Sequence, residues 1–349
     1  MKLLSTTLTG NNAAQIGGAL ESAIGWVDAC LVIDTGVTDD TLDIAKRIAG
    51  CKLVVRSFPW VGDFSAARNF ALDAAAELGA DWCMTLDTDE RMALHGADVY
   101  SVLAQTSARV LRVADEAGTY EKERFFKLPM EVRFTGPTHE SFPAYKAGVA
   151  TLERVSFSEL PKTVEQSRTK FDRDATILAA YTQEHPQDPR WFYYLGESLK
   201  SLGRNEEAIA AYERCASLRG WNEESAWACY RTAEILVAIG RFEDAIDRCA
   251  LGLARHAGIP ELAWLAAFAS WQAGRADQAS YWARMAIPMG MFKGEGGKVH
   301  RIGFRHPPGQ WEGPYDVLRF ALKALGDGNG AEEAEGMYQQ AEKARKGVT

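Results

Sequence analysis

The sequence predicts an α/β domain with a mainly parallel sheet, followed by an all-α domain of helical repeats. The chain has 349 residues, enough for about two domains of ordinary size. Up to about residue 160, short apolar runs rich in β-branched residues alternate with helical patterns, which is typical of βαβ crossovers. From about residue 165 only helical patterns follow, and glycines recur at Gly203, Gly240 and Gly274. We therefore expect one domain at residues 1–160 and a second at residues 165–349.

The first domain is expected to contain four strands separated by helices. The strands are predicted at Lys2–Leu8, Ala29–Asp34, Lys52–Phe58 and Trp82–Leu86, and the helices at Ala13–Ile24, Thr41–Ile48 and Phe64–Glu77. Asp63 stands where the last of these helices needs an N-cap. In a parallel sheet the ligand crevice lies beyond the carboxyl ends of the strands. The acids expected there are Asp34, Asp87 and Asp89.

The second domain repeats with a period close to that of a known helical repeat. Each of the three recurring glycines is followed five positions later by an alanine. Small residues at such places let paired helices approach closely, and glycine suits the turn between them. The spacing resembles the tetratricopeptide repeat, with the best matches at Gly196, Gly203, Ala208 and Tyr212. Further helices at Glu165–Glu184, Pro314–Leu325 and Ala331–Lys346 are expected to extend or cap the stack.

Composition and charge exclude several classes of protein. A hydrophobic fraction of 47% with 25% charged residues is ordinary globular usage, which excludes a disordered or collagen-like chain. The net charge of −8 argues against binding nucleic acid by charge alone. No apolar run has the ~18 residues of a membrane span, and the first apolar run is too short for a signal peptide. The six cysteines form no C-x-x-C pair, so we expect reduced thiols and a cytoplasmic protein, in the host cytoplasm if phage-encoded.

The sharpest chemical motif is Leu86-Asp87-Thr88-Asp89-Glu90. Residues i and i+2 of a strand point the same way, so Asp87 and Asp89 are expected to converge beyond the sheet. Two adjacent carboxylates repel each other unless a cation or a proton is shared between them. Mn²⁺ or Mg²⁺ takes oxygen ligands and keeps positions for phosphate oxygens, which stabilises a diphosphate leaving group. The alternative is structural, with one aspartate capping the next helix.

Two further motifs precede this one in a fixed order. They are Asp34-Thr35-Gly36-Val37-Thr38-Asp39 and Asp63-Phe64-Ser65-Ala66-Ala67-Arg68-Asn69. The three motifs together resemble the family 2 glycosyltransferases of bacterial or phage type, which carry tetratricopeptide repeats behind the catalytic domain. The resemblance spans nearly the whole chain. It implies a GT-A-like domain of the nucleotide-diphospho-sugar transferase fold, and inverting transfer from a nucleotide-diphosphate sugar by a hexosyltransferase-like enzyme.

The resemblance also implies roles for individual residues. Asp34 would contact the base or ribose of the donor, and Arg68 or Asn69 would help to hold the nucleotide. The full predicted donor set is Thr7, Asn11, Asp34, Gly36, Asp39, Arg68, Asn69, Asp87 and Thr88, and the predicted metal ligands are Asp87, Asp89 and His139. The chain departs from the family pattern at Gly10-Asn11-Asn12, where Lys-Asn-Glu is usual, and at Val37, where Ser is usual. Both departures lie around the donor, so the identity of the sugar and base stays open.

A single displacement needs a general base near the acceptor. Thr138-His139-Glu140, after the strand-like Val132–Phe134, resembles the late His-Glu motif of the family, and we predict Glu140 as the base. His139 would bind metal or diphosphate, or shape the acceptor site. The structural alternative for Glu140 is an ion pair with Arg124 or Arg133. Weaker rivals for the base are Asp115, Glu121 and Glu123.

One basic segment interrupts the repeats. It carries Lys293, Lys298, His300, Arg301, Arg305 and His306. A solvated loop is the ordinary explanation for such a run, and contact with an anionic acceptor is the functional one. The Gly-rich stretch at its start lacks the first Gly and the final Ser or Thr of a phosphate-binding P-loop.

The sequence therefore predicts a glycosyltransferase that depends on Mn²⁺ or Mg²⁺. Its acceptor would be a hydroxyl or thiol on a glycan, lipid, peptide or hydroxylated DNA base. The repeats are expected to contact the acceptor or a partner, and a homodimer through the repeats is a further expectation. A rival interpretation is a degenerate transferase domain that serves as a protein-binding scaffold, which the intact motif at residues 86–90 disfavours. A nucleotidyltransferase would carry a Gly-rich basic signature near the first strand, and the sequence has none there.

Overall fold

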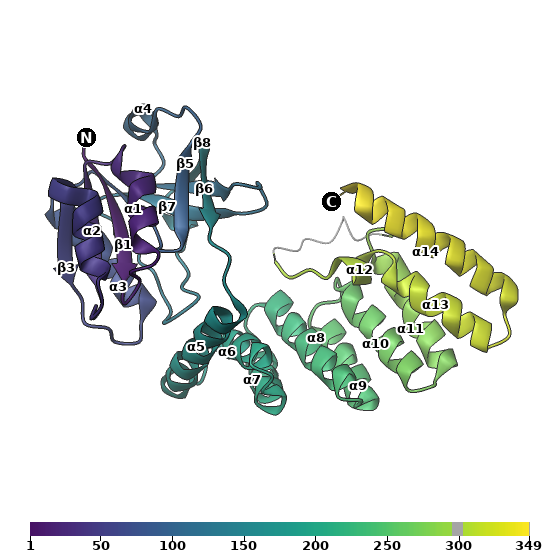
Figure 1. The fold of residues 1–349 in the computed structure, drawn as a ribbon. Helices are drawn as coiled ribbons and strands as arrows, with labels where there is room; N and C mark the ends of the chain where they lie inside the picture. Colours follow the sequence, from purple (N-terminus) through teal and green to yellow (C-terminus); the bar gives the residue numbers. More distant parts are fainter. Residues whose placement is uncertain (295–302, 349) are drawn as a thin grey trace. The chain divides into compact units, whose positions relative to one another are not determined.

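The computed structural model describes residues 1–294 and 303–348. The chain divides into two compact units, residues 1–167 and residues 168–349. Figure 1 shows a sheet flanked by helices in the first unit and a stack of helices in the second. The predicted order, an α/β domain followed by an all-α repeat domain, is confirmed.

The first unit is built on one eight-stranded sheet. Its strand order is β3-β2-β1-β4-β7-β6-β8-β5. The strands are β1 (Leu3–Thr9), β2 (Ala29–Asp34), β3 (Leu53–Ser57), β4 (Trp82–Thr85), β5 (Glu90–Leu94), β6 (Val110–Asp115), β7 (Glu121–Lys127) and β8 (Val149–Glu159). The four predicted strands form β1 to β4 and pair in parallel, and β7 then joins β4 in the antiparallel sense. The carboxyl ends of β1, β2, β3 and β4 therefore meet at one edge of the sheet.

Helices cover both faces of this sheet. They are α1 (Ile16–Ile24), α2 (Thr41–Ala49), α3 (Phe64–Glu77) and α4 (Val99–Gln105), with short 3₁₀ turns at Gly50–Lys52 and Ala144–Lys146. Alternate strand residues point to opposite faces, so Leu3 and Val32 pack in one core with α1 and α2. Leu4 and Ile33 pack in a second core with α3. Both faces of the sheet are therefore apolar and buried, and polar chemistry is left to the strand ends.

Several elements differ from the sequence-based expectation. The strands β5 to β8 are not among those predicted, and the strand-like Val132–Phe134 is not a strand. The reason lies in Asn69, whose side chain accepts from the backbone N–H of Phe134 at 2.9 Å and donates to its carbonyl at 3.0 Å. These side-chain hydrogen bonds replace the ladder that a strand would need.

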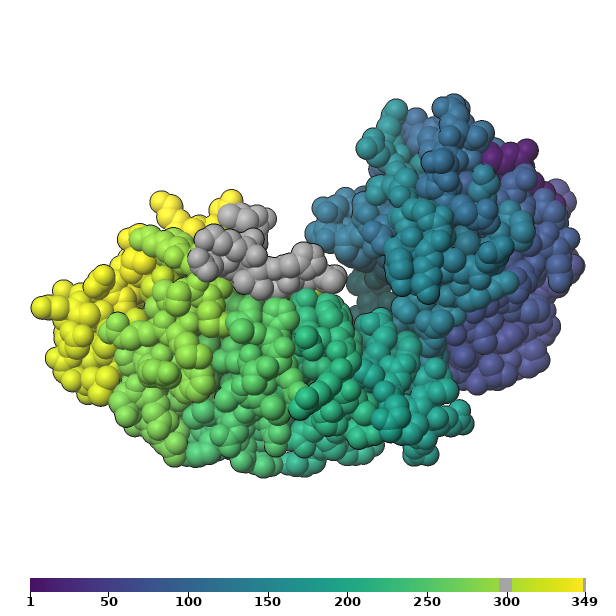
Figure 2. Space-filling view, turned by 180° about the vertical axis from the view of Figure 1, so that it is seen from behind, coloured from purple at the N-terminus to yellow at the C-terminus, as the bar shows by residue number. Residues whose placement is uncertain are grey.

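The second unit consists of helices that pack in successive pairs. They are α5 (Val164–Glu184), α6 (Pro189–Ser201), α7 (Asn205–Leu218), α8 (Asn222–Ala238), α9 (Phe242–Arg255), α10 (Pro260–Gln272), α11 (Ala276–Met289), α12 (Pro307–Gln310), α13 (Gly313–Ala324) and α14 (Gly328–Val348). The colours in Figure 2 run in sequence order from α6 to α14, as expected for a stack of repeats.

Two kinds of glycine explain the repeat pattern. Gly203, Gly240 and Gly274 have φ of +75°, +80° and +75° in the turns between paired helices, where a side chain would be strained. Gly196 lies on α6 against the ring of Tyr212 on α7, and a Cβ there would approach Cε1 of the ring to 2.5 Å. Among the described residues no helix is long and apolar enough to cross a membrane.

Candidate active site

The loops after β1 and β2 are joined by the side chain of Asn11. Its Oδ1 atom accepts from the backbone N–H groups of Thr38 at 2.7 Å and of Asp39 at 3.3 Å. Asp34, the last residue of β2, accepts through Oδ1 from the N–H groups of Gly36 and Val37 at 2.9 and 2.8 Å. Within the described chain, Oδ2 of Asp34 makes no hydrogen bond. The two loops thus form one ordered edge, with a carboxylate oxygen of Asp34 available to a ligand.

Two other predicted donor residues have mainly local roles. Asp39 accepts from the backbone N–H of Thr41 at 3.0 Å and from its hydroxyl, at the start of α2. The hydrogen bond from the Thr41 side chain lowers the pKa of Asp39 below its usual value. Thr7 lies within β1 with no exposed surface. The donor contact of Thr7 therefore stays a prediction.

Thr88 and Asp89 form a turn between β4 and β5, and here the strand-based argument was wrong. The strand β4 ends at Thr85, and the N–H of Glu90 donates to the carbonyl of Asp87 at 3.0 Å. The two aspartates are therefore not on the same side of a strand. Their ion-pair partners differ accordingly: Asp87 pairs with Arg68, and Asp89 pairs with Lys162.

Arg68 of α3 joins the predicted base, Glu140, to Asp87, a predicted donor and metal residue. Its Nη2 atom donates to Oδ1 of Asp87 at 3.0 Å, and its Nε donates to Oε1 of Glu140. The Arg68 side chain is only 14% exposed. Burial by itself lowers the pKa of Arg68, but the charges of Asp87 and Glu140 raise it well above its usual value. The guanidinium thus holds both carboxylates along one edge.

A second set of charged side chains, Glu90, Arg124 and Lys122, lies next to Asp87. Glu90 is 1% exposed and pairs with Arg124, which is 6% exposed, and with Lys122 at 3.2 Å. Arg124 also lies 3.7 Å from Oδ2 of Asp87. Burial raises the pKa of Asp87, but Arg68 and Arg124 outweigh it and lower that pKa to about 2. Asp87 is therefore ionised and fixed between two arginines.

Glu90 has the opposite pKa shift from Asp87. Burial, followed by the charge of Asp87, raises the pKa of Glu90, while Arg124 and Lys122 act against that rise. Glu90, Arg124 and Lys122 were not among the predicted site residues. In the sequence, only Glu90 stands next to the two aspartates. Arg124 and Lys122 lie in β7, far from Glu90 in the sequence, so no local pattern links them to the site.

The sequence-derived metal ligands do not form a ready-made metal site. No group of three or more His, Cys, Asp or Glu side chains that could hold a metal ion occurs in residues 1–294 and 303–348. Oδ2 of Asp89 accepts from Nζ of Lys162 at 2.6 Å, and that lysine is 38% exposed. One or two carboxylates are nevertheless enough for Mg²⁺ or Mn²⁺ when substrate phosphates and water supply the other ligands. The carboxylates of Asp87 and Asp89 are of the oxygen-ligand type that such an ion takes.

Glu140 is carried by a short loop that is closed on itself. Thr135 and Ser141 exchange backbone hydrogen bonds at 3.0 and 2.9 Å. The N–H of Phe64, the first residue of α3, donates to the carbonyl of Pro137 at 2.8 Å, which docks the loop on the helix. His139 has φ of +48°, in the left-handed region, immediately before Glu140. This fixed backbone directs Glu140 toward Arg68.

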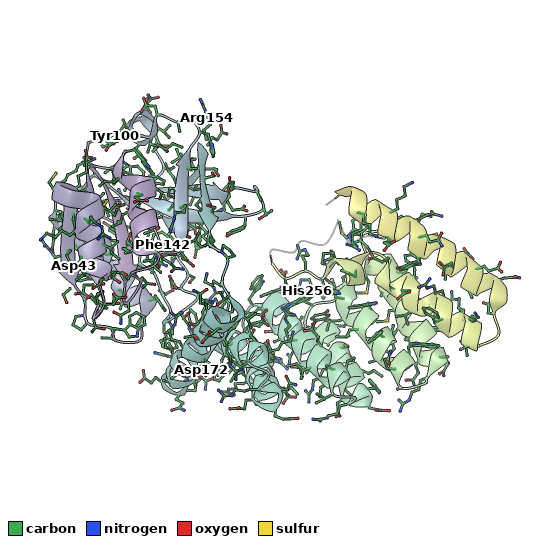
Figure 3. All side chains as sticks on the ribbon, viewed as in Figure 1. Asp43, Tyr100, Phe142, Arg154, Asp172 and His256 are labelled. Atoms are coloured by element: carbon green, nitrogen blue, oxygen red, sulfur yellow. The ribbon has the colours of Figure 1, made fainter. Side chains whose placement is uncertain are left out.

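Three phenylalanine rings pack together at the base of the loop that carries Glu140. The ring centroids of Phe134 and Phe142, which flank the loop, lie 4.9 Å apart. Phe142, labelled in Figure 3, also lies 5.0 Å from Phe126 of β7. Asn69 holds the backbone of Phe134, so its two polar groups are used within the protein. Asn69 therefore positions the loop, and the predicted contact between Asn69 and the nucleotide is not supported.

The alternatives to Glu140 have other partners. Arg133 pairs with Asp73 at 2.8 Å, so the ion pair of Glu140 is with Arg68 and neither with Arg133 nor with Arg124. Asp115 accepts from the N–H groups of Thr119 and Tyr120 in a turn, and those backbone hydrogen bonds lower the pKa of Asp115. The remaining rivals also have local partners: Glu121 bonds to Thr151, and Glu123 pairs with Arg112.

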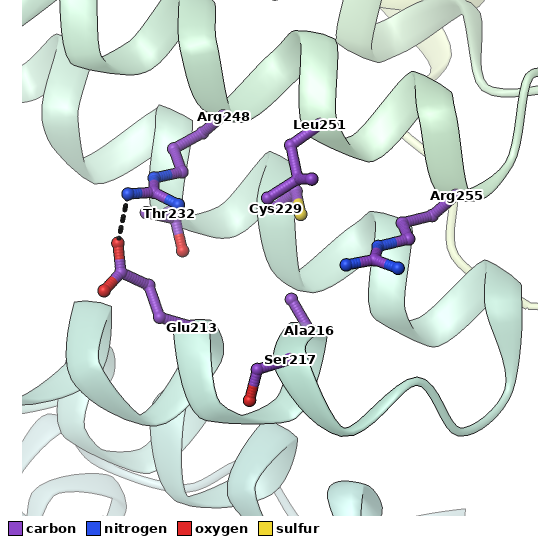
Figure 4. A pocket seen from close by; sticks show the side chains of 8 residues that line it. All are labelled: Glu213, Ala216, Ser217, Cys229, Thr232, Arg248, Leu251 and Arg255. Carbon is purple, nitrogen blue, oxygen red and sulfur yellow. Dashed lines mark ion pairs between the residues drawn. The ribbon is translucent and has the colours of Figure 1, made fainter.

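A cavity in the repeat unit contains none of these residues. It has a volume of about 130 Å³ and lies among α7, α8 and α9. Figure 4 shows the ion pair between Glu213 and Arg248 at one side of it, at 3.0 Å. The lining residues are Glu213, Ala216, Ser217, Cys229, Thr232, Arg248, Leu251 and Arg255. No predicted catalytic or donor residue is among them.

The predicted basic segment is only partly described. Lys298, His300 and Arg301 lie outside the described residues. Arg305 lies 3.4 Å from the buried Glu223, and His306 stacks on Trp264. These two side chains are therefore not part of a simple solvated basic loop.

Comparison with known proteins finds similarity to a glycosyltransferase family and to a repeat-containing protein. Residues 8–95 match the model of glycosyl transferase family 2. A TPR repeat-containing protein of Synechococcus elongatus is 40% identical over 213 residues, covering 56% of this chain and 50% of its own. The SPbeta prophage-derived glycosyltransferase SunS of Bacillus subtilis is 25% identical over 219 residues, covering 57% of this chain and 49% of its own.

Shorter matches fall on glycosyltransferases of Rickettsia. One from Rickettsia felis is 34% identical over 91 residues, covering 26% of this chain and 30% of its own length. The chain thus spans about half the length, or less, of the curated relatives that it matches. The solved structure of MamA aligns with 53% of this chain and 98% of its own, at 16% identity and a TM-score of 0.41.

Proposed function

Because this chain carries a family 2 glycosyltransferase domain followed by tetratricopeptide-like repeats, we propose that it transfers a sugar from a nucleotide-diphosphate sugar to an acceptor. The acceptor group is a hydroxyl or thiol, and Glu140 is the general base. The observation that carries the proposal is the shared guanidinium of Arg68, which bonds to both Asp87 and Glu140. Asp87, proposed to face the donor, and Glu140, proposed to face the acceptor, therefore lie next to each other on one guanidinium.

The first step of the proposal is donor binding at the carboxyl ends of the strands. Asp34 ends β2 and has a carboxylate oxygen available to the base or ribose. Asp87 lies two residues after the end of β4. Arg68 and Arg124 keep it ionised, as its low pKa indicates. The neighbouring cations Arg68, Arg124, Lys122 and Lys162 suit the negative charge of a diphosphate. Gly36 has φ of +115°, which gives the backbone of the Asp34 loop a turn that a side chain would disfavour.

The second step is displacement at the anomeric carbon. The acceptor oxygen forms a bond to that carbon while the bond from carbon to diphosphate breaks, and the nucleoside diphosphate leaves with the electron pair. Glu140 takes the proton of the acceptor group. Its Oε1 is held by Arg68, and its Oε2 makes no hydrogen bond within the described residues. Oε2 is therefore the atom that would accept the proton, and the configuration at the anomeric carbon would invert.

A divalent ion bound through Asp89 would supply Lewis-acid stabilisation of the leaving diphosphate. Asp89 is the better ligand because its partner is the partly exposed Lys162. Asp87 is held by two buried arginines, which makes it a weaker candidate. The metal contact of His139 and the donor contact of Thr88 stay predictions.

The test is a screen of donors with the purified full chain. A panel of nucleotide-diphosphate sugars is incubated with Mn²⁺ or Mg²⁺, and release of nucleoside diphosphate is measured with and without pools of glycan, lipid, peptide or hydroxylated DNA. We expect release from one donor class that rises with one acceptor pool. Absence of release from every donor with either metal, by a protein whose circular dichroism shows it to be folded, would overturn the proposal.

A matched pair of variants separates enzyme from scaffold. Glu140→Gln removes the proposed base, and Glu121→Gln changes a carboxylate that bonds only to Thr151 among the described residues. The transferase predicts loss of turnover in the first variant alone. A scaffold with a degenerate transferase domain would give no turnover in any of the three proteins.

A further inference from the structure

A short segment of the chain lies across the repeat helices. We call residues 303–306, Gly-Phe-Arg-His, the strap; they lead directly into α12. The strap has neither helix nor strand structure, and His306 is extended, with φ of −129° and ψ of 95°. It contacts the first helix of three successive pairs, α6, α8 and α10. In Figure 1, α12 lies next to α10.

Aromatic side chains hold the strap on these helices. The ring of Phe304 lies 5.0 Å from Tyr193 of α6 and stacks on Trp227 of α8, at 5.8 Å with an angle of 11°. The ring of His306 stacks on Trp264 of α10, at 5.0 Å with an angle of 15°. Alternate residues of the strap therefore engage successive helices, as the side chains of an extended peptide would.

Two buried acids bind the backbone of the strap. Glu223 is 2% exposed, and its Oε1 accepts from the N–H of Gly303 at 3.1 Å and lies 3.4 Å from Nη1 of Arg305. Glu261 has no exposed surface, and its Oε1 accepts from the N–H of His306 at 3.2 Å. The same oxygen of Glu261 accepts from Nε2 of Gln310 at 2.8 Å. A buried carboxylate is costly without donors, so both acids favour a chain that brings N–H groups, and Glu223 also favours a cation. The surface thus binds backbone N–H groups through both acids and a positive charge through Glu223.

The strap packs against the hydrophobic core of the repeats and is not buried within it. Phe304 and His306 are half-buried although each contacts several rings, and Arg305 is exposed. The first buried residue after the strap is Gly309, which packs against Trp264 and Glu261. A ligand bound on a surface has this pattern, because one side of each of its side chains stays in contact with water.

We propose that the strap is an internal ligand, and that the surface under it binds an extended polypeptide with an aromatic residue followed by a basic one. The binding surface consists of Tyr193, Trp227 and Trp264 together with Glu223 and Glu261. The strap occupies it in the resting protein, and a partner peptide of the same chemistry replaces the strap. The inference concerns binding by the repeats alone and holds whichever acceptor the transferase domain uses.

The covalent link gives the strap an advantage over any free peptide. A segment tethered by a short linker acts at an effective concentration of about millimolar. A free peptide of equal intrinsic affinity therefore competes poorly with the strap, and its apparent affinity falls by the fraction of protein in which the surface is open. Weakening the strap should thus raise the affinity for an added peptide without any change in the surface itself.

The experiment uses the full chain and a synthetic probe. The probe is the acetylated and amidated peptide GFRHPPG, which has the sequence of residues 303–309. The double variant Phe304→Ala, Arg305→Ala removes two of the three strap side chains and leaves the binding surface intact. Calorimetry should show binding of the probe at least about tenfold tighter to the double variant than to the wild type. A probe with Ala in place of Phe should bind neither protein.

Two further variants keep the test decisive. Arg305→Glu alone places a carboxylate beside Glu223 and should open the strap with a smaller change in packing. Glu223→Gln in the double variant should weaken probe binding several-fold, because a neutral amide attracts the arginine of the probe less. The proposal is overturned if folded strap variants bind the probe no better than the wild type does. It also fails if both strap variants lose their helical circular dichroism, because the strap is then structural.

Discussion

The Nη2 atom of Arg68 lies 3.0 Å from Oδ1 of Asp87, and the neighbouring Nε of the same guanidinium donates to Glu140. The three residues come from α3, the turn after β4 and a closed loop, which are far apart in sequence. A planar guanidinium presents Nε and Nη2 along one edge, so it can hold two carboxylates side by side. Arg68 thus couples the donor side of the proposed site to the acceptor side.

Replacing Glu140 by Gln should reduce turnover while donor binding persists. Loss of a positioned base lowers kcat by about 10²–10⁴-fold. Calorimetry with the donor nucleotide should give a Kd within about threefold of the wild type, because Glu140 does not contact the donor in the proposed arrangement. Weakened donor binding with normal transfer would show that Glu140 belongs to the donor site instead.

Replacing Arg68 by Lys should lower kcat by about 10–100-fold. A lysine keeps the charge but has a single ammonium, which cannot hold Asp87 and Glu140 in fixed positions, and small displacements of reacting groups are costly. The matched control is Arg133→Lys, which changes an arginine paired with Asp73 at the surface and should leave kcat within about twofold. Equal kcat values for the two variants would contradict the coupling role of Arg68.

Replacing Asp89 by Asn should abolish metal-dependent turnover, because a neutral amide is a poor ligand for a hard divalent ion. Excess EDTA should inactivate the wild-type protein, and added Mn²⁺ should restore it. Thermal unfolding of Asp89→Asn should stay close to the wild type, since Asp89 has only a partly exposed lysine as its ion-pair partner. Full activity in EDTA would exclude the proposed role of the metal.

Acid should destabilise the wild type more than Asp87→Asn. The folded-state pKa of Asp87 is about 2, below the value of about 3.9 expected in an unfolded chain. Its stabilising contribution is therefore fully present above about pH 4 and is lost as the pH falls toward 2. Urea unfolding of both proteins between pH 6 and about pH 2.5 measures this difference. Parallel curves for the two proteins would mean that Asp87 is not held by its arginines in solution.

Replacing Gly196 by Ala should destabilise the repeat unit by about 1–3 kcal/mol. The added Cβ would lie 2.5 Å from the ring of Tyr212, so α6 and α7 must move apart. The matched control is Gly336→Ala on α14, where a Cβ meets nothing within 4 Å. That variant should be stabilised by about 0.5–1 kcal/mol, since alanine favours helix more than glycine does. Denaturant unfolding followed by circular dichroism compares the two.

Local sequence patterns predicted the first four strands, the helices between them and most of the repeat helices. The strand Ala29–Asp34 and the helix Phe64–Glu77 have the bounds that the sequence predicts, and Asp63 caps that helix through a hydrogen bond to the N–H of Ala66. These features depend on period, propensity and capping, which are properties of consecutive residues. The later strands β5 to β8 have weaker local signals and depend on pairing with distant segments.

The class of both domains, the order of the motifs and the acids worth testing can be predicted from the amino-acid sequence, because each depends on residues that are neighbours in the chain. The partners of those acids depend on the three-dimensional fold. It placed Arg68 between Asp87 and Glu140, Arg124 behind Asp87, and the strap on Trp227 and Trp264. The physical reason is that an ion pair or a ring contact depends on where the chain returns in space, and residues 19, 37 or 72 positions apart carry no local sign of it.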